Sequence, residues 1–151
     1  MKAIAAMSEN RVIGNQGKIP WHIPADFKWF KECTLDSTLI MGRKTVESLP
    51  KKLPRRSIIT LSGNKSTEKI MSMVKLIENN QDATNPRPVW LCGGAKIYSL
   101  LLPYCTELYL TRVHKEYVGD TFFPSFEDMF GRVGIFFESN EFTIERWERI
   151  L

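Results

Sequence analysis

Short apolar runs alternate with polar turns along most of the chain, and this pattern predicts an α/β protein. The runs KAIAAM, TLIM, SIITL and PVWLC are apolar enough for buried strands, and each is followed by a polar or glycine-containing turn. Between them, ADFKWFKECT and GGAKIYSLLL favour helices. The run MVKLI is interpreted as a further strand. The polar stretch that follows it, ENNQDATNPRP, predicts no helix.

The last third of the chain predicts strands without intervening helices. ELYLTRV and FTIERWERI alternate apolar and polar positions at period two, and GIFF adds apolar residues ahead of the second run. Strands alternating with helices favour a parallel sheet, whereas the late strands favour an antiparallel addition at one edge. We therefore expect one α/β domain over residues 1–151, with a mostly parallel central sheet flanked by helices.

Composition narrows the class of protein. The chain has 151 residues, 43% of them hydrophobic, and no apolar run approaches the roughly 20 residues of a membrane helix. The start, MKAIAAMSENR, is too soon polar for a signal peptide, so we expect a cytoplasmic protein without a membrane partner. Three widely spaced cysteines indicate reduced thiols. Two histidines make a zinc site unfavourable, and we expect no metal.

The net charge of +4 comes from scattered basic residues. Such an excess is typical of a solvated surface. Because most of these residues flank turns, an anionic small molecule is the alternative. No dense basic patch and no nucleic-acid-binding motif is present, so no nucleic-acid partner is expected.

Three predicted strands end in turns of similar form. The turns are Gly42-Arg43-Lys44-Thr45, Ser62-Gly63-Asn64 and Gly93-Gly94-Ala95-Lys96. Helix N-termini offer backbone N–H groups to phosphates, and open parallel sheets bind ligands at the carboxyl ends of their strands. Each turn alone also fits an ordinary strand-to-helix connection, but the three together favour a polyphosphate ligand. No GxGxxG fingerprint occurs, so a dinucleotide would bind without the Rossmann turn.

The stretch IPWHIPADFKWFK places one carboxylate, Asp26, at the start of a predicted helix. Pro24 suits the first helical turn, and an acid there complements the helix dipole by about 0.3–1 kcal/mol. Asp26 also shares a helix face with Phe30, and Phe27 lies three residues from Phe30. An acid beside two rings suits a flat heterocycle with an amidine-like edge. Local rules leave both interpretations open.

Taken in order, nine segments resemble the bacterial type of dihydrofolate reductase: IAAM, RVIG, PWHIPADFKWFK, IMGRKTVES, LPRR, IITLS, GGAKIY, LYLT and GDTFFP. The resemblance is weakest over 67–87 and after Phe130. It implies an oxidoreductase that reduces 7,8-dihydrofolate to 5,6,7,8-tetrahydrofolate, for one-carbon metabolism and thymidylate synthesis. NADPH would supply a hydride to pterin C6, with protonation of N5. A monomer that binds antifolate inhibitors is also implied.

The resemblance implies roles for individual residues. Asp26 matches the acid that holds the pterin, Thr111 the residue bonded to it, and Trp21 the residue that places a water nearby; these three are the expected catalytic residues. Arg56 matches the arginine that pairs with the folate α-carboxylate. The other expected substrate-binding residues are Ile4, Ala5, Phe27, Phe30, Ser48, Leu49, Leu53, Cys92 and Tyr98.

The implied NADPH site runs along the strand ends. Arg43, Ser62 and Lys96 match positions that hold the adenosine 2′-phosphate, and in the family Gly93 and Gly94 are joined by a cis peptide. The other expected cofactor-binding residues are Ala6, Ile13, Gly14, Ile19, Gly42, Lys44, Thr45, Leu61, Gly63, Cys92, Ala95, Ile97 and Tyr98.

Several residues depart from the family pattern. Cys92 lies where the family usually has Ile or Val, and Phe27 where it often has Leu. Ile19 replaces the usual Met or Leu, and Ala95 replaces a third glycine. The final loop, SNEF, is shorter than in the best-known bacterial enzymes, and in the family it contacts the segment from Gly14 to Trp21, so we expect loop gating to differ. With Cys92 and Phe27 in the pocket, antifolate sensitivity does not carry over. Two alternatives are a related NADPH reductase of riboflavin biosynthesis, which reduces a ribose, and a nucleotide-binding module without catalysis. Asp26 together with Arg56 argues against the first.

Overall fold

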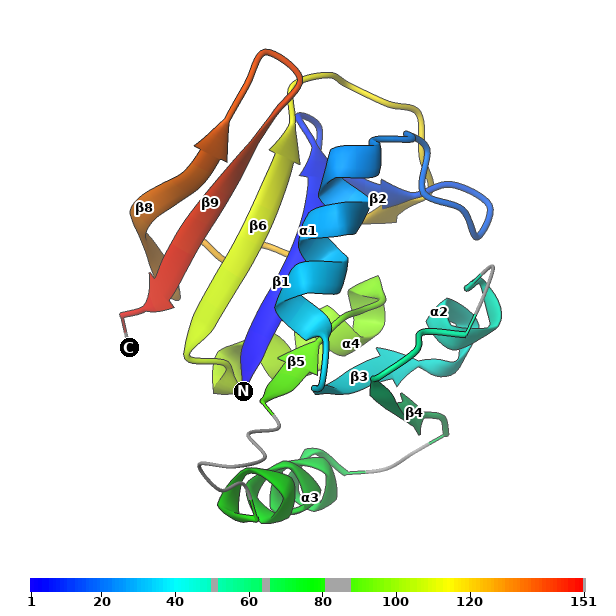
Figure 1. Cartoon of the computed structure of the whole chain (residues 1–151), viewed down its shortest axis with the longest axis vertical. Helices are drawn as coiled ribbons and strands as arrows, with labels where there is room; N and C mark the ends of the chain where they lie inside the picture. The colour runs from blue at the N-terminus through cyan, green and yellow to red at the C-terminus, as the bar shows by residue number, and fades with distance from the viewer. Residues whose placement is uncertain (50–51, 64–65, 81–87, 151) are drawn as a thin grey trace.

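The computed structural model describes residues 1–49, 52–63, 66–80 and 88–150, and its centre is a seven-stranded sheet (Figure 1). The strand order is β4-β3-β5-β1-β6-β9-β8. The strands are β1 (Lys2–Ser8), β3 (Thr38–Gly42), β4 (Ser57–Leu61), β5 (Val89–Leu91), β6 (Glu107–Val113), β8 (Phe130–Glu138) and β9 (Phe142–Arg149). A separate two-stranded sheet pairs β2 (Val12–Gly14) with β7 (Thr121–Phe122). The helices are α1 (Pro24–Thr34), α2 (Arg43–Glu47), α3 (Thr67–Asn79), α4 (Ala95–Leu101) and the 3-10 turn η1 (Leu102–Tyr104).

The strand directions confirm the predicted sheet. β4, β3, β5, β1 and β6 are parallel to one another, whereas β9 runs antiparallel to β6, and β8 runs antiparallel to β9. The parallel strands alternate with helices in the chain, as the pattern of apolar runs and turns predicts. The carboxyl ends of β3 and β5 lead directly into α2 and towards α4.

The predicted strand MVKLI is wrong, because residues 73–77 lie within α3. Ser66 caps this helix by accepting a hydrogen bond from the Lys69 N–H at 3.2 Å. Ile70 and Val74 are buried, and Met73 and Ile77 pack beside the same core, so the apolar positions follow helical spacing. Five residues were too few to reveal this period. The polar stretch 78–88 begins inside the end of α3, and residues 81–87 lie outside the described residues.

Two further elements were not predicted at their full extent. Residues 12–14 form β2, although the sequence predicts no strand between KAIAAM and TLIM, and β8 begins at Phe130 rather than at the GIFF run. β2 is only three residues long, and its partner β7 is two, so neither carries a strand-length apolar pattern.

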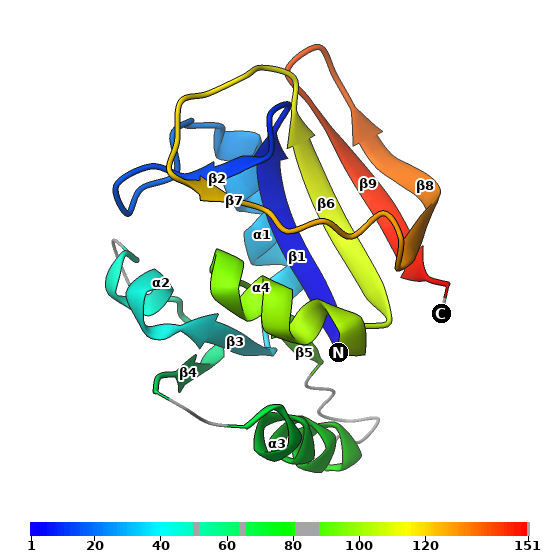
Figure 2. The same cartoon turned by 180° about the vertical axis from the view of Figure 1, so that it is seen from behind.

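Helices cover both faces of the sheet. α1 lies across one face in Figure 1, and α4 lies across the opposite face in Figure 2. On the α1 side, Trp29 and Phe30 pack against a buried cluster that contains Ile4, Leu39 and Met41. The opposite core contains the following fully buried side chains: Met7, Leu91, Leu101, Leu102, Leu108, Leu110, Phe126 and Phe130. Burying both faces fits near-continuous apolar strands such as β3.

Candidate active site

Asp26 and Thr111 meet at the start of α1. The helix begins at Pro24, as predicted, and Asp26 lies in its first turn. Thr111 of β6 is buried and donates its hydroxyl to Asp26 Oδ1 at 2.7 Å. Burial raises the pKa of Asp26 above its ordinary value, although the Thr111 hydrogen bond acts in the lowering direction. The contact therefore presents a carboxyl group that retains a proton at higher pH than an exposed aspartate does.

Apolar side chains surround the Asp26 end of the sheet. Phe30, Leu49, Leu53 and Cys92 pack against one buried cluster that contains Ile4. Trp21 is buried in the adjoining cluster, which also includes Ala6 as a partly buried member. The structure thus places most of the residues expected to line the pterin pocket against two neighbouring clusters.

The two phenylalanines of α1 do not have the same environment. Phe30 packs into the buried cluster, whereas Phe27 is 43% exposed. The Phe27 ring lies 5.7 Å from the His22 ring, centroid to centroid, at the entrance to α1. The shared aromatic face expected from sequence is therefore divided into one packed ring and one open ring.

The Gly93–Gly94 turn brings the start of α4 against the start of α2. The peptide bond between the two glycines is cis, as the family resemblance implies. A Cβ on Gly94 would lie 3.0 Å from Thr45 Oγ1, and a Cβ on Gly42 would lie 3.1 Å from Ile97 Cγ1. Gly42 N–H donates to the Gly93 carbonyl at 2.8 Å. A side chain at either position would force Thr45 or Ile97 to shift by a few tenths of an ångström, so glycine suits both helix starts.

Neither of these helix starts has a side-chain cap. Gly42 precedes α2 and Gly94 precedes α4, and no side chain accepts a hydrogen bond from the first turn of either helix. Backbone N–H groups at the two adjoining starts are available to an anion. Arg43, Lys44 and Lys96 are exposed around them, with Arg43 Nη1 3.0 Å from Glu47 Oε1. Ser62 and Gly63 are exposed at the end of the neighbouring β4.

Tyr98 connects the glycine turn with β1. Its buried hydroxyl donates to the Ile4 carbonyl at 2.6 Å, and a Cβ on Gly93 would lie 3.1 Å from its ring. Burial raises the pKa of Tyr98 well above its ordinary value, so the hydroxyl stays protonated. The Ile4 carbonyl keeps a second lone pair for a ligand.

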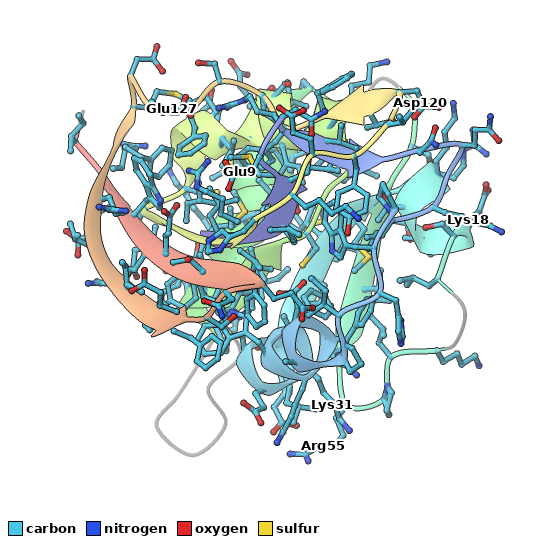
Figure 3. The ribbon with its side chains drawn as sticks, turned by 90° about the horizontal axis from the view of Figure 1, so that it is seen from above. Glu9, Lys18, Lys31, Arg55, Asp120 and Glu127 are labelled. Atoms are coloured by element: carbon cyan, nitrogen blue, oxygen red, sulfur yellow. The ribbon has the colours of Figure 1, made fainter. Side chains whose placement is uncertain are left out.

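The basic residues after α2 have different partners. Arg56 donates to Thr34 Oγ1 at 3.3 Å and to the Pro54 carbonyl at 3.1 Å, and makes no ion pair with the described residues. Arg55 instead forms a two-bond contact with Asp36, at 2.6 and 3.1 Å. Figure 3 shows Arg55 on the same side of the molecule as Lys31 of α1. Ser48 is exposed, and its hydroxyl donates to the Thr45 carbonyl at 2.7 Å.

The remaining expected cofactor residues are spread over several elements. Leu61 is buried, whereas Ala95 and Ile97 are partly buried in α4. Ile13 packs beside the core that contains Tyr98. Gly14 lies in β2, and Ile19 is 51% exposed; among the described residues, no hydrogen bond joins either of them to the Gly93–Gly94 turn.

Sequence reasoning missed a clasp between residues 9–21 and residues 115–123. Asp120 Oδ2 accepts from the Gln16 N–H at 3.0 Å, and Asn10 makes two hydrogen bonds with the Tyr117 backbone, at 2.8 and 3.1 Å. The rings of Trp21 and Tyr117 lie 5.4 Å apart. The only sequence signal was the Gly-Asp pair at 119–120, a common turn signature.

The short SNEF loop forms the turn between β8 and β9 and is bonded to the end of β6. His114 Nε2 lies 2.7 Å from Thr143 Oγ1, and His114 Nδ1 lies 3.3 Å from the Asn140 carbonyl. Within the described parts of the chain, no hydrogen bond joins this turn to residues 14–21. No helix in the described residues is long and apolar enough to span a membrane, and these residues contain no cluster of three potential metal ligands.

Known proteins share this arrangement. Among solved structures, dihydrofolate reductase from Enterococcus faecalis, complexed with NADP(H) and RAB-propyl, matches with a TM-score of 0.81 and 32% sequence identity. The match covers 99% of this chain and 95% of that chain. The likeness therefore includes the antiparallel edge as well as the parallel part of the sheet.

Relatives found by sequence are also dihydrofolate reductases. Dihydrofolate reductase of Buchnera aphidicola subsp. Acyrthosiphon pisum is 43% identical over 126 residues, covering 82% of this chain and 78% of the relative. The Bacillus subtilis enzyme is 39% identical over 127 residues, covering 83% of this chain and 76% of the relative. The family model described as dihydrofolate reductase matches residues 1–138. With this sheet, this glycine turn and these relatives, the chain belongs to the dihydrofolate reductase family.

Proposed function

We propose that this chain reduces 7,8-dihydrofolate to 5,6,7,8-tetrahydrofolate with NADPH. The observation that carries the proposal is the 2.7 Å contact between Asp26 and Thr111 at the start of α1, within a chain of the dihydrofolate reductase family. A half-buried acid in an apolar surround is suited to hold the polar edge of a flat heterocycle.

The described residues fit a dinucleotide phosphate. The uncapped starts of α2 and α4 adjoin at distances that favour glycine, and exposed cations lie around them. Gly42 to Thr45 and Gly94 to Ile97 would bind the phosphates through backbone N–H groups and hydroxyls. When bound, NADPH supplies the hydride that the pterin receives at C6.

The protein's own contribution is orientation and control of a proton. We assign Asp26 the role of holding pterin N3 and the 2-amino group, with Thr111 fixing the carboxyl orientation. Trp21 is proposed to place a water that delivers the proton to N5. The Ile4 and Cys92 carbonyls complete the pterin edge, and Phe30 with Leu49 and Leu53 packs against the aminobenzoyl part. Electrostatic orientation of this kind lowers the barrier without a covalent intermediate.

Absorbance at the nicotinamide band, followed with NADPH and dihydrofolate, tests the function directly. Loss of absorbance only when both compounds are present is expected. A flat trace with folded protein that binds NADPH would leave the nucleotide-binding module. A reductase of the riboflavin type would oxidise NADPH with a ribosyl-aminopyrimidine instead, and such an enzyme has no use for Asp26.

Arg56 is expected to set the affinity for the glutamate end of the substrate. Arg56→Gln should raise KM for dihydrofolate roughly tenfold or more, because a charged hydrogen bond to a carboxylate is lost. The value of kcat should change little, since this contact is far from the hydride acceptor. Arg55→Gln is the matched control, because the Arg55 guanidinium is already bound to Asp36. Equal KM values for Arg56→Gln and the parent chain would contradict the assignment.

Arg43 is expected to distinguish NADPH from NADH. Arg43→Gln should raise KM for NADPH roughly tenfold while leaving KM for NADH unchanged, because only NADPH carries the 2′-phosphate. Glu47→Gln is the control: it removes the partner of Arg43 but keeps the cation. An equal rise of KM for NADPH and NADH would show that Arg43 does not bind the 2′-phosphate.

We further infer a single domain over residues 1–151 that acts as a monomer in the cytoplasm and binds antifolates. One continuous sheet supports the single domain. The monomer is supported by two register shifts in the edge strand β8, since bulges discourage pairing between sheet edges. Three free cysteines suit a reducing compartment.

A further inference from the structure

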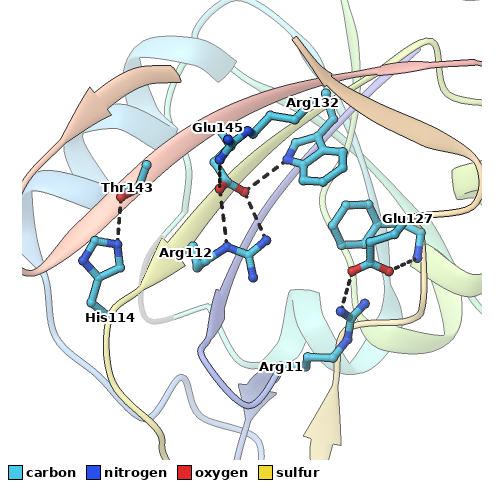
Figure 4. A network of polar contacts seen from close by, with 9 residues as sticks. Arg11, Arg112, His114, Glu127, Arg132, Thr143 and Glu145 are labelled. Carbon is cyan, nitrogen blue, oxygen red and sulfur yellow. Dashed lines mark hydrogen bonds and ion pairs between the residues drawn. The ribbon is translucent and has the colours of Figure 1, made fainter. Parts of the chain in front are cut away.

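Glu145 of β9 is a buried carboxylate held by three strands. It accepts hydrogen bonds from Arg112 of β6 at 3.1 and 3.4 Å and from Arg132 of β8 at 3.3 Å (Figure 4). Trp147 Nε1, on the same strand, donates to it at 3.1 Å. The Glu145 side chain is only 5% exposed. A charge this buried is tolerated only with such partners, so Glu145 and the two arginines act as a unit.

This cluster lies directly behind Thr111. In the pairing of β6 with β9, Leu110 is opposite Glu145, Thr111 opposite Ile144, and Arg112 opposite Thr143. Successive strand residues point to opposite faces, so Thr111 faces Asp26 while Arg112 points to the far face. Through Arg112, Glu145 therefore holds β6 at the residue that follows Thr111.

We propose that Glu145 is a positioning residue for dihydrofolate reduction: by holding Arg112, it fixes β6 at the level where the Thr111 hydroxyl meets Asp26. This inference rests on the function proposed above. It predicts that loss of the Glu145–Arg112 contact weakens the Thr111–Asp26 hydrogen bond, although Glu145 itself lies on the other face of the sheet.

The charge of Glu145 and its hold on β6 predict opposite changes in the Asp26 pKa when Glu145 is removed. Loss of its negative charge, acting through space, would favour ionised Asp26 and lower the Asp26 pKa. Loss of the Thr111 hydrogen bond would remove a lowering influence and raise that pKa. Among the described residues, the titratable groups whose pKa is raised by the Asp26 charge are Cys33 of α1 and Tyr98 of α4. Burial raises the pKa of Cys33 to about 11 and that of Tyr98 well above its ordinary value, so both remain neutral.

Glu145→Gln in the full chain separates these effects. The Asp26 carboxyl carbon, followed by NMR with carbon-13 aspartate and no ligand, should titrate at higher pH than in the parent. The fall of turnover with pH should move in the same direction. Thr111→Val should shift both in that direction too, and the double variant should add nothing beyond Thr111→Val. Glu148→Gln, which removes another β9 carboxylate whose partner among the described residues is Arg146, should leave the titration unchanged.

Glu145→Asp keeps the charge but shortens the side chain, and serves if the glutamine variant does not fold. It should also raise the pH at which Asp26 titrates, and a charge effect cannot explain such a rise because the charge is kept. The proposal would be overturned if Asp26 titrated at the same or a lower pH in the Glu145 variants. It would also be overturned if the shifts caused by Glu145→Gln and Thr111→Val simply added in the double variant. Absence of turnover in the parent chain would instead overturn the proposed function, because the NMR titration requires no substrate.

Discussion

Asp26→Asn is expected to lower the turnover rate at neutral pH roughly a hundredfold or more, while the binding of NADPH is retained. The amide is nearly the same size and still accepts the Thr111 hydrogen bond, which is 2.7 Å long in the parent. It has no acid proton to share with the bound pterin or with the water that protonates N5. Steady-state rates and a fluorescence titration with NADPH measure the two properties separately. Full activity in this variant would remove Asp26 from the mechanism.

The pH dependence of the same variant gives a second test. Burial raises the pKa of Asp26, so parent activity should fall as pH rises through that raised value. The variant has no carboxyl group to titrate and should show a flatter profile over this range. Glu32→Gln, an exposed acid on the same helix, is the control and should keep the parent profile.

Stability should respond to pH through the same group. The folded chain holds the Asp26 proton more tightly than the unfolded chain, so the free energy of unfolding falls as pH rises from the ordinary aspartate pKa through the raised one. Asp26→Asn removes this loss and should unfold at a higher temperature than the parent at neutral pH. A lower unfolding temperature would show that the charged form is the one the fold stabilises.

Gly119→Ala is expected to damage both stability and turnover. A Cβ there would lie 2.3 Å from Val12 Cγ1 and 2.7 Å from the Gly14 carbonyl oxygen, and the second contact is with backbone. β2 must move away from β7, at a cost of about 1–3 kcal/mol. Denaturant unfolding measures this cost. Gly134→Ala is the control, because nothing lies within 4 Å of its added Cβ.

The loss of turnover should follow from the position of Asp120. This residue accepts from Gln16 N–H at 3.0 Å and is the next residue after Gly119. Moving β2 from β7 therefore releases the clasp between residues 9–21 and 115–123, including Trp21. A single-turnover hydride transfer rate equal to that of the parent would show that the clasp does not affect the chemistry.

The sequence predicted what depends on neighbouring residues. Apolar runs bounded by turns predicted the strands of the sheet, and Pro24 marked the start of α1. α3 was misassigned because a five-residue apolar run fits either period. The role of Asp26 could not be decided locally, because its partner Thr111 is 85 residues away. Glu145 gave no signal either: alternation in β9 suggests a solvent-facing acid, and its burial depends on two arginines from other strands as well as on Trp147.

The separation between Asp26 and Thr111 has a consequence for synthesis of the protein. β6, which carries Thr111, lies between β1 from the beginning of the chain and β9 from its end. A growing chain with α1 already formed still has no hydroxyl to orient the acid, and β6 stays unpaired on one side until residues 142–149 have been made. Long-range pairings of this kind form late. Appearance of activity during translation therefore reports completion of the whole sheet rather than formation of the helix that carries the acid.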